Sequence, residues 1–130
     1  IWVATPHGAA RIDGSAVTAF GRKDGLPVDR VLQVLVDGRG VVWMATHGGG
    51  LVRHDGGGFE AIGRRDGLST EYLISLAEDR SGALWVGTLS GGLNRLTPAV
   101  RELLDSRAGL PPFPTTTIYQ ARTGTYWIGT

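Results

Sequence analysis

The residues Leu84-Trp85-Val86-Gly87-Thr88 decide the fold, because their pattern occurs four times: an apolar or aromatic residue, Trp, an apolar residue, Gly or Ala, and Thr. The copies are Ile1 to Thr5, Val42 to Thr46, Leu84 to Thr88 and Tyr126 to Thr130. Every tryptophan belongs to a copy, and successive tryptophans are 41, 42 and 42 residues apart. A period of this length indicates a repeat protein, in which each unit buries its apolar face against its neighbours.

One unit, from Asp24 to Arg65, consists of short apolar runs between turn residues. The expected strands cover residues 31–36, 41–46, 51–54 and 59–62. The run at 31–36 is almost wholly apolar, which is typical of a strand buried on both faces. Glycine-rich turns separate the runs, so we expect an antiparallel meander of four strands.

The segment from Pro98 to Arg107 is the one place where a short helical turn competes with a strand. Val100, Leu103 and Leu104 would share a helical face. The 42-residue register, however, aligns Leu104 with residues 62 and 20, which end the fourth strand of earlier units. We therefore predict a fourth strand here as well.

Repeated four-stranded meanders are typical of β-propeller blades, which pack face to face around an axis. A tryptophan on the second strand would fill the gap between adjacent blades. Leu26 and Leu68 would close the junctions, while Asp24 and Asp66 would accept hydrogen bonds in their turns. We predict an all-β fold of about three blades, as a partial propeller or a ring completed by oligomerisation. The units are a partial blade at 1–20, blades at 21–62 and 63–104, and a partial blade at 105–130, with thirteen strands in all.

Composition narrows the range of functions. The chain has 130 residues, 42% of them hydrophobic, no cysteine and a net charge of +1. Without a basic run we expect no nucleic-acid partner, and without cysteine no disulfide or thiolate chemistry. No apolar run reaches the ~18 residues of a membrane helix, so we expect no direct membrane contact. No secretion signal is visible in the sequence.

Residues 66–95 carry the pattern most fully: Asp-Gly-Leu, an apolar strand, Asp-x-x-Gly-x-Leu-Trp-x-Gly-Thr and Gly-Gly-Leu-x-Arg. This order resembles the two-component regulator propeller repeat, and the resemblance covers essentially the whole chain. It implies a sensor propeller of a bacterial hybrid two-component system, periplasmic or otherwise extracytoplasmic. It also implies a non-catalytic role, in which the propeller binds a small molecule such as a carbohydrate and a downstream kinase reads the change.

Ligands of propellers usually meet one face, here called the top face. It is formed by the loops between the second and third strands and by those between the fourth strand and the next blade. The candidate ligand-binding residues on it are His7, Arg30, His47, Arg64, Arg65, Tyr72 and Ser90. Guanidinium and aromatic groups there could bind carboxylate, sulfate or sugar. The alternative is that all seven are solvated loop residues.

His7 and His47 occupy equivalent loops, where two imidazoles could share a metal or act in acid–base catalysis. No third ligand has the spacing of a zinc site, so we expect no metal, no cofactor and no catalytic residue. Two other functions stay open. One is a propeller lyase or hydrolase with a histidine and a carboxylate on the top face. The other is an interaction or assembly module that binds protein along its rim or edge, through an unpaired edge at Trp2 or Trp127. Under each of these functions we expect the propeller to be completed by copies of the chain or by the remaining blades of a parent protein.

Overall fold

The computed structural model describes residues 1–130 and contains thirteen strands and three short 3₁₀ turns. The strands are β1 (Trp2–Thr5), β2 (Gly8–Asp13), β3 (Ala16–Phe20), β4 (Val31–Val36), β5 (Val42–Thr46), β6 (Leu51–His54), β7 (Phe59–Ile62), β8 (Leu73–Glu78), β9 (Leu84–Thr88), β10 (Leu93–Leu96), β11 (Arg101–Leu104), β12 (Thr117–Gln120) and β13 (Tyr126–Gly129). The number of strands agrees with the prediction, and the doubtful segment is the strand β11.

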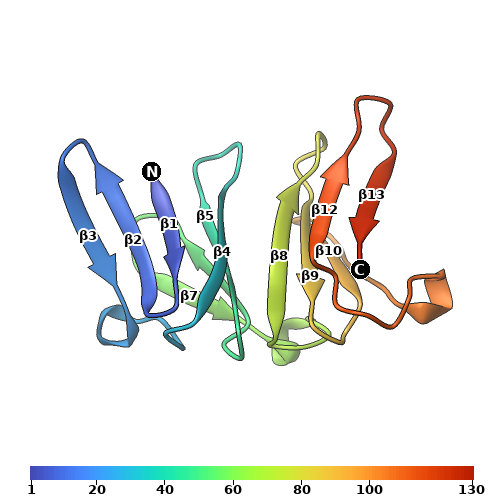
Figure 1. Cartoon of the computed structure of the whole chain (residues 1–130), viewed down its shortest axis with the longest axis horizontal. Coiled ribbons are helices and arrows are strands. Elements are labelled where there is room, and N and C mark those ends of the chain that lie inside the picture. Colours follow the sequence, from blue (N-terminus) through green and yellow to red (C-terminus); the bar gives the residue numbers. More distant parts are fainter.

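The strands form four sheets, in each of which consecutive strands pair antiparallel. We call them blade 1 (β1–β3), blade 2 (β4–β7), blade 3 (β8–β11) and blade 4 (β12–β13). The blades stand side by side, with strands β4, β8 and β12 next to one another, and the later strands of blades 2 and 3 lie behind β4 and β8 (Figure 1). The all-β prediction of four-stranded meanders is confirmed by blades 2 and 3.

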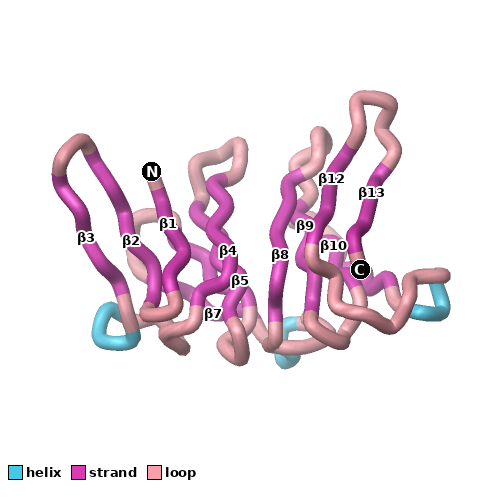
Figure 2. Tube along the Cα trace, viewed as in Figure 1, coloured by secondary structure: helices cyan, strands magenta, loops and turns pink.

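Each connection from one blade to the next begins with a 3₁₀ turn, where the sequence had indicated only a tight turn. These are η1 (Arg22–Asp24), η2 (Arg64–Asp66) and η3 (Ser106–Ala108). Asp24 and Asp66 each close their turn by accepting the N–H of the residue three positions earlier, at 2.8 and 2.9 Å. All three turns lie at the same end of the blades, which is the top face and points downward in Figures 1 and 2.

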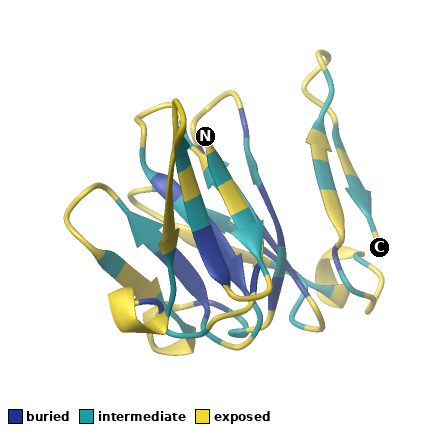
Figure 3. Cartoon of the chain, turned by 60° about the vertical axis from the view of Figure 1, so that its left-hand side comes forward, coloured by how far each residue is buried: buried dark blue, intermediate teal, exposed yellow.

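The core lies between blades rather than within one blade, as expected for stacked sheets. One cluster joins blades 1 and 2 and consists of Ala9, Leu26, Val31, Val42, Met44 and Val52. A second joins blades 2 and 3 and consists of Ala45, Leu51, Leu68, Leu73, Leu76, Leu84 and Val86. Leu26 and Leu68 therefore lie in the junctions for which the sequence proposed them. Figure 3 shows this buried interior and the more exposed hairpin β12–β13.

The four tryptophans are buried to very different extents. Trp85 is only 6% exposed, Trp2 and Trp43 are half-buried, and Trp127 is 65% exposed. The prediction that tryptophan fills the gap between adjacent blades therefore fits Trp85 best. It does not fit Trp127, because no further blade packs on the side of blade 4 that carries this indole. The prediction that 31–36 is buried on both faces is also wrong, since Leu32 and Val36 are exposed.

The small residue after each Trp-x pair allows the blades to approach closely. A Cβ at Gly87 would overlap the Ser75 hydroxyl and lie 2.5 Å from the Thr115 carbonyl oxygen. Ser75 donates its hydroxyl to that same carbonyl at 2.7 Å, which joins blade 3 to the segment entering blade 4.

We expect Gly87→Ala to destabilise the chain by about 1–3 kcal/mol, because the added methyl must push these groups apart. Gly57→Ala is the matched control, since its Cβ would meet nothing closer than 3.6 Å. Urea unfolding measures both variants, and equal stability of the two would contradict the close approach at Gly87.

Candidate functional site

The top face carries an aromatic pair at the junction of blades 2 and 3. His47, after β5, forms a backbone bridge with Tyr72, before β8. Their rings meet edge to face, with centroids 5.1 Å apart and planes at 82°. Gly48 and Gly50 donate their N–H groups to the Glu71 carbonyl at 3.0 and 3.1 Å. Backbone hydrogen bonds thus hold the pair in place across two blades.

Three arginines predicted for this face lie on segments that adjoin those of the His47–Tyr72 pair. The Arg30 carbonyl accepts the N–H of His47 at 3.0 Å. Arg64 and Arg65 lie on η2, and the Arg64 N–H donates to a Glu71 carboxylate oxygen at 3.2 Å. All three side chains are exposed, and no ion pair within the chain uses them. The top face therefore carries three arginines without an ion pair, together with the Glu71 carboxylate and the aromatic pair.

The other two predicted residues do not join this group. His7 is exposed in the turn between β1 and β2, where its N–H donates to the Thr5 hydroxyl at 3.2 Å. Ser90 follows β9 and lines a separate cavity of about 350 Å³, together with Asp105 and Phe113. No group of three potential metal-ligating side chains is present. None of the helical segments has the length and apolarity needed to cross a membrane.

A repeated contact that sequence reasoning missed lies near the opposite ends of the blades. In blade 2 the indole N–H of Trp43 donates to Asp37 at 2.8 Å, and in blade 3 that of Trp85 donates to Asp79 at 2.8 Å. The other carboxylate oxygen of each Asp accepts backbone N–H groups of its own turn. The constant six-residue spacing from Asp to Trp was the available signal.

Asp79 also binds the next blade. Its Oδ2 accepts the hydroxyl of Tyr126, on β13, at 2.7 Å, in addition to the indole of Trp85. The rings of Trp85 and Tyr126 have centroids 4.7 Å apart. The Arg95 guanidinium lies 5.6 Å from the Trp85 ring centroid, a cation–π contact. One buried carboxylate thus connects blades 3 and 4.

The hydrogen bonds that Asp79 accepts lower its pKa by more than its burial raises it. Burial alone would raise the pKa of Asp79, but donation from Ser81, Trp85 and Tyr126 holds the pKa well below its usual range. The pKa of Tyr126 is raised by burial and by the neighbouring carboxylate. Asp79 is therefore ionised and Tyr126 protonated at neutral pH, which matches the direction of their hydrogen bond.

The lowered pKa of Asp79 predicts a pH-dependent stability. In the unfolded chain the Asp79 carboxylate is protonated at about pH 4, whereas in the folded chain it is protonated only at lower pH. Its contribution to the free energy of unfolding is therefore complete above about pH 4 and decreases as the pH falls below that value. Urea unfolding from pH 7 down to pH 3 should show a smaller loss in Asp79→Asn than in the wild type. Asp13→Asn, which removes an exposed carboxylate, should leave the loss unchanged. An equal loss in wild type and Asp79→Asn would refute the coupling.

Comparison with known families gives one match. Residues 67–90 match the family model described as the two component regulator propeller. This segment is therefore similar to one two-component regulator propeller repeat. The matched segment holds β8, β9, Asp79 and Trp85, so it contains the turn and indole contact described above. No curated protein sequence matches the chain.

Solved structures share the fold of this repeat protein. Two describe the extracellular domain of BT4673 from B. thetaiotaomicron, given in one case as a proposed one-component system and in the other as a proposed hybrid two-component system. They superpose with TM-scores of 0.79 and 0.78 at 18% identity, over 98% of this chain and 20% of theirs. The extracellular domain of the proposed hybrid two-component system BT3049 from the same organism gives a TM-score of 0.51 at 18% identity, over 99% of this chain and 24% of that one. The chain thus spans about a fifth to a quarter of the structures it resembles.

Proposed function

We propose that this chain is part of the ligand-binding region of an extracytoplasmic bacterial sensor, acting by binding and not by catalysis. The observation that carries the proposal is the propeller repeat at residues 67–90. It is supported by the fold shared with extracellular domains of proposed one-component and hybrid two-component systems. A ligand would act by favouring the arrangement of the blades that it binds more tightly. The size of this shift is limited by the difference between its affinities for the two arrangements.

The top face is our proposed place for the ligand. A backbone bridge holds the His47–Tyr72 pair between two blades, and Tyr72 is 46% exposed. Aromatic faces stack on sugar rings, and the unpaired guanidinium groups of Arg30, Arg64 and Arg65 suit carboxylate or sulfate substituents. The ligand class that fits is a small molecule with these groups, such as an acidic or sulfated carbohydrate.

Thermal-shift screening against a panel of neutral, acidic and sulfated sugars tests this proposal. A hit should lose most of its stabilising shift in Tyr72→Ala. Tyr119→Ala is the matched control, because Tyr119 is similarly exposed, at 59%, on β12 away from the top face. Absence of any hit at saturating ligand, or equal loss in both variants, would count against a top-face sugar site.

We also propose that a further blade covers the open side of blade 4. Trp127 is 65% exposed, whereas the equivalent Trp85 is covered by Tyr126 of the next blade. The covering blade would belong to a longer parent chain or to a second copy. Sedimentation of the chain separates these sources: concentration-dependent association lost in Trp127→Ser supports a second copy, and a monomer at all concentrations rules that source out.

A further inference from the structure

The junction of blades 1 and 2 and the junction of blades 2 and 3 can be compared position by position, because the pairing registers align these three blades. Leu51 pairs with Ile62 in blade 2 as Ala9 pairs with Phe20 in blade 1. On the facing blade, His54 pairs with Phe59 in blade 2, and Leu96 pairs with Arg101 in blade 3. The first two junctions therefore have equivalent places for side chains: a tryptophan, a residue ending the fourth strand, and the paired residues on the third and fourth strands of the facing blade. Blade 4 has only the strands β12 and β13, so at the third junction the facing blade contributes Tyr126 of β13.

In the junction of blades 1 and 2 these places hold aromatic rings in mutual contact. Trp2 stacks on Phe20 with centroids 5.4 Å apart and meets His54 at 5.4 Å. Phe59 lies 4.7 Å from His54 and 5.5 Å from Phe20. In the junction of blades 3 and 4, Tyr126 lies against Trp85 at 4.7 Å. Aromatic side chains thus occupy the gap at both outer junctions.

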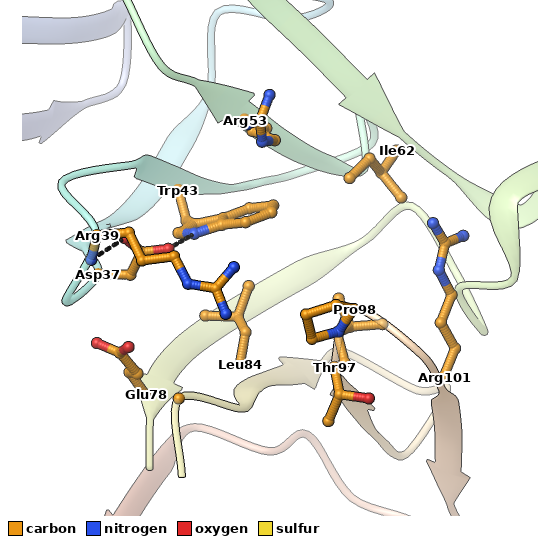
Figure 4. A pocket seen from close by; sticks show the side chains of 12 residues that line it. Asp37, Arg39, Trp43, Arg53, Ile62, Glu78, Leu84, Thr97, Pro98 and Arg101 are labelled. Atoms are coloured by element: carbon orange, nitrogen blue, oxygen red, sulfur yellow. Dashed lines mark hydrogen bonds between the residues drawn. The ribbon is translucent and has the colours of Figure 1, made fainter. Parts of the chain in front are cut away.

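The junction of blades 2 and 3 has smaller or charged residues at the equivalent places and holds an open pocket of about 250 Å³. Ile62 stands where blade 1 has Phe20, and Leu96 and Arg101 stand where blade 2 has His54 and Phe59. Figure 4 shows the Trp43 indole on one side of the pocket and Leu84 and Pro98 on the other. The pocket is lined by none of the seven top-face residues.

Some of the charged side chains around this pocket already have partners within the chain, and others are free to bind a ligand. Arg53 pairs with Asp55 at 2.8 Å, and Asp37 already accepts three N–H groups. Glu78 accepts the N–H of Gly38 at 2.9 Å. Arg39 and Arg101 have no ion pair or side-chain hydrogen bond within the chain, although both line the pocket. The pocket lining thus combines the Trp43 indole and apolar side chains with two guanidinium groups that have no partner within the chain.

From this geometry we propose that the pocket between blades 2 and 3 binds a small aromatic carboxylate. A ring would lie against the Trp43 indole, where the outer junctions place their own aromatic rings. The carboxylate would form charge-assisted hydrogen bonds with Arg39 or Arg101. The Trp43 indole faces Leu84 and Pro98 across the pocket (Figure 4), and these apolar surfaces suit the two faces of an aromatic ring. The volume suits one substituted ring and not a larger ligand.

The test is a titration of the ¹⁵N-labelled chain with phenylacetate, observed at the indole N–H resonances. The Trp43 resonance, assigned with Trp43→Phe, should move saturably, because a bound ring changes the field at an indole whose N–H is fixed to Asp37. The Trp85 resonance should not move. The uncharged analogue 2-phenylethanol and the ring-free analogue acetate should each bind at least about tenfold more weakly, since each lacks one of the two required features.

Three variants separate pocket binding from other causes. The double variant Arg39→Gln with Arg101→Gln should weaken phenylacetate binding by about fivefold to tenfold, because it removes both guanidinium groups, while Arg22→Gln, at an exposed arginine on η1, should leave binding unchanged. The double variant Leu96→His with Arg101→Phe places the facing-blade residues of the first junction, His54 and Phe59, at the equivalent positions and should abolish binding by filling the pocket. An unchanged Trp85 resonance in each variant shows that the fold is retained.

No saturable shift at Trp43 would overturn the proposal, and so would a shift that survives in the filled double variant. Equal binding of phenylacetate and 2-phenylethanol would overturn the claim that an arginine binds the carboxylate of the ligand. These outcomes are independent of the sugar screen, because Tyr72→Ala leaves the pocket lining intact and the pocket variants leave the top face intact.

Discussion

Replacing Trp85 by alanine should lower the free energy of unfolding by about 3–5 kcal/mol, the usual cost of truncating a large buried aromatic side chain. The indole is buried between blades 3 and 4, against Tyr126 and beneath Arg95, and its N–H is bonded to Asp79. The substitution removes this packing and leaves the carboxylate without one donor. Urea unfolding followed by circular dichroism measures the change.

Trp127→Ala is the matched control, because Trp127 occupies the same place in its repeat but is 65% exposed. Its expected cost is within about 0.5 kcal/mol, as for other surface substitutions. The comparison separates the position in the repeat from the burial that a neighbouring blade provides. Similar costs for the two variants would show that blade 3 and blade 4 do not pack as described.

Asp79→Ala should destabilise the chain by about 3 kcal/mol or more. The substitution leaves the buried N–H groups of the Trp85 indole and the Ala83 backbone, and the half-buried hydroxyl of Tyr126, without this acceptor. Each buried unsatisfied donor costs about 1–3 kcal/mol, and the contributions are not fully additive. Phenylalanine in place of Tyr126 should recover part of the loss in the double variant, because it removes one orphaned donor.

Asp37→Ala is the control for this prediction. Asp37 forms the equivalent bonds to its turn and to Trp43, but it is half-buried and contacts no hydroxyl of the next blade. Water can replace more of its hydrogen bonds, so the expected cost is about 1 kcal/mol. If the two Asp→Ala variants were equally stable, Asp79 would not be the link between blades 3 and 4.

The repeat made the fold predictable from sequence. Four Trp motifs at a nearly constant period set the register, and the register identified β11 correctly where local helical spacing competed with it. The burial of Leu26 and Leu68 followed from their position between units. The exposure of Leu32, Val36 and Trp127 could not be read in the same way, because burial in a propeller depends on which blade stands opposite.

The side-chain contacts between blades were harder to anticipate. The indole–carboxylate hydrogen bonds could be predicted only by knowing that the β4–β5 and β8–β9 turns bring their aspartates to the tryptophan indoles. The His47–Tyr72 pair joins two residues that the sequence placed on one face but not in contact. The pocket at Trp43 arises from substitutions on two different blades, so only the paired registers reveal it.

Hydrogen exchange of the four indole N–H groups, followed by NMR, tests the central claim that each junction is built around a differently buried tryptophan. We predict slow exchange for Trp85, slower than for Trp43, because both are bonded to an Asp but only Trp85 is almost fully buried. Trp127 should exchange at nearly the rate of free indole. Fast exchange at Trp85, or equal protection of Trp85 and Trp127, would contradict this account of how the blades are joined.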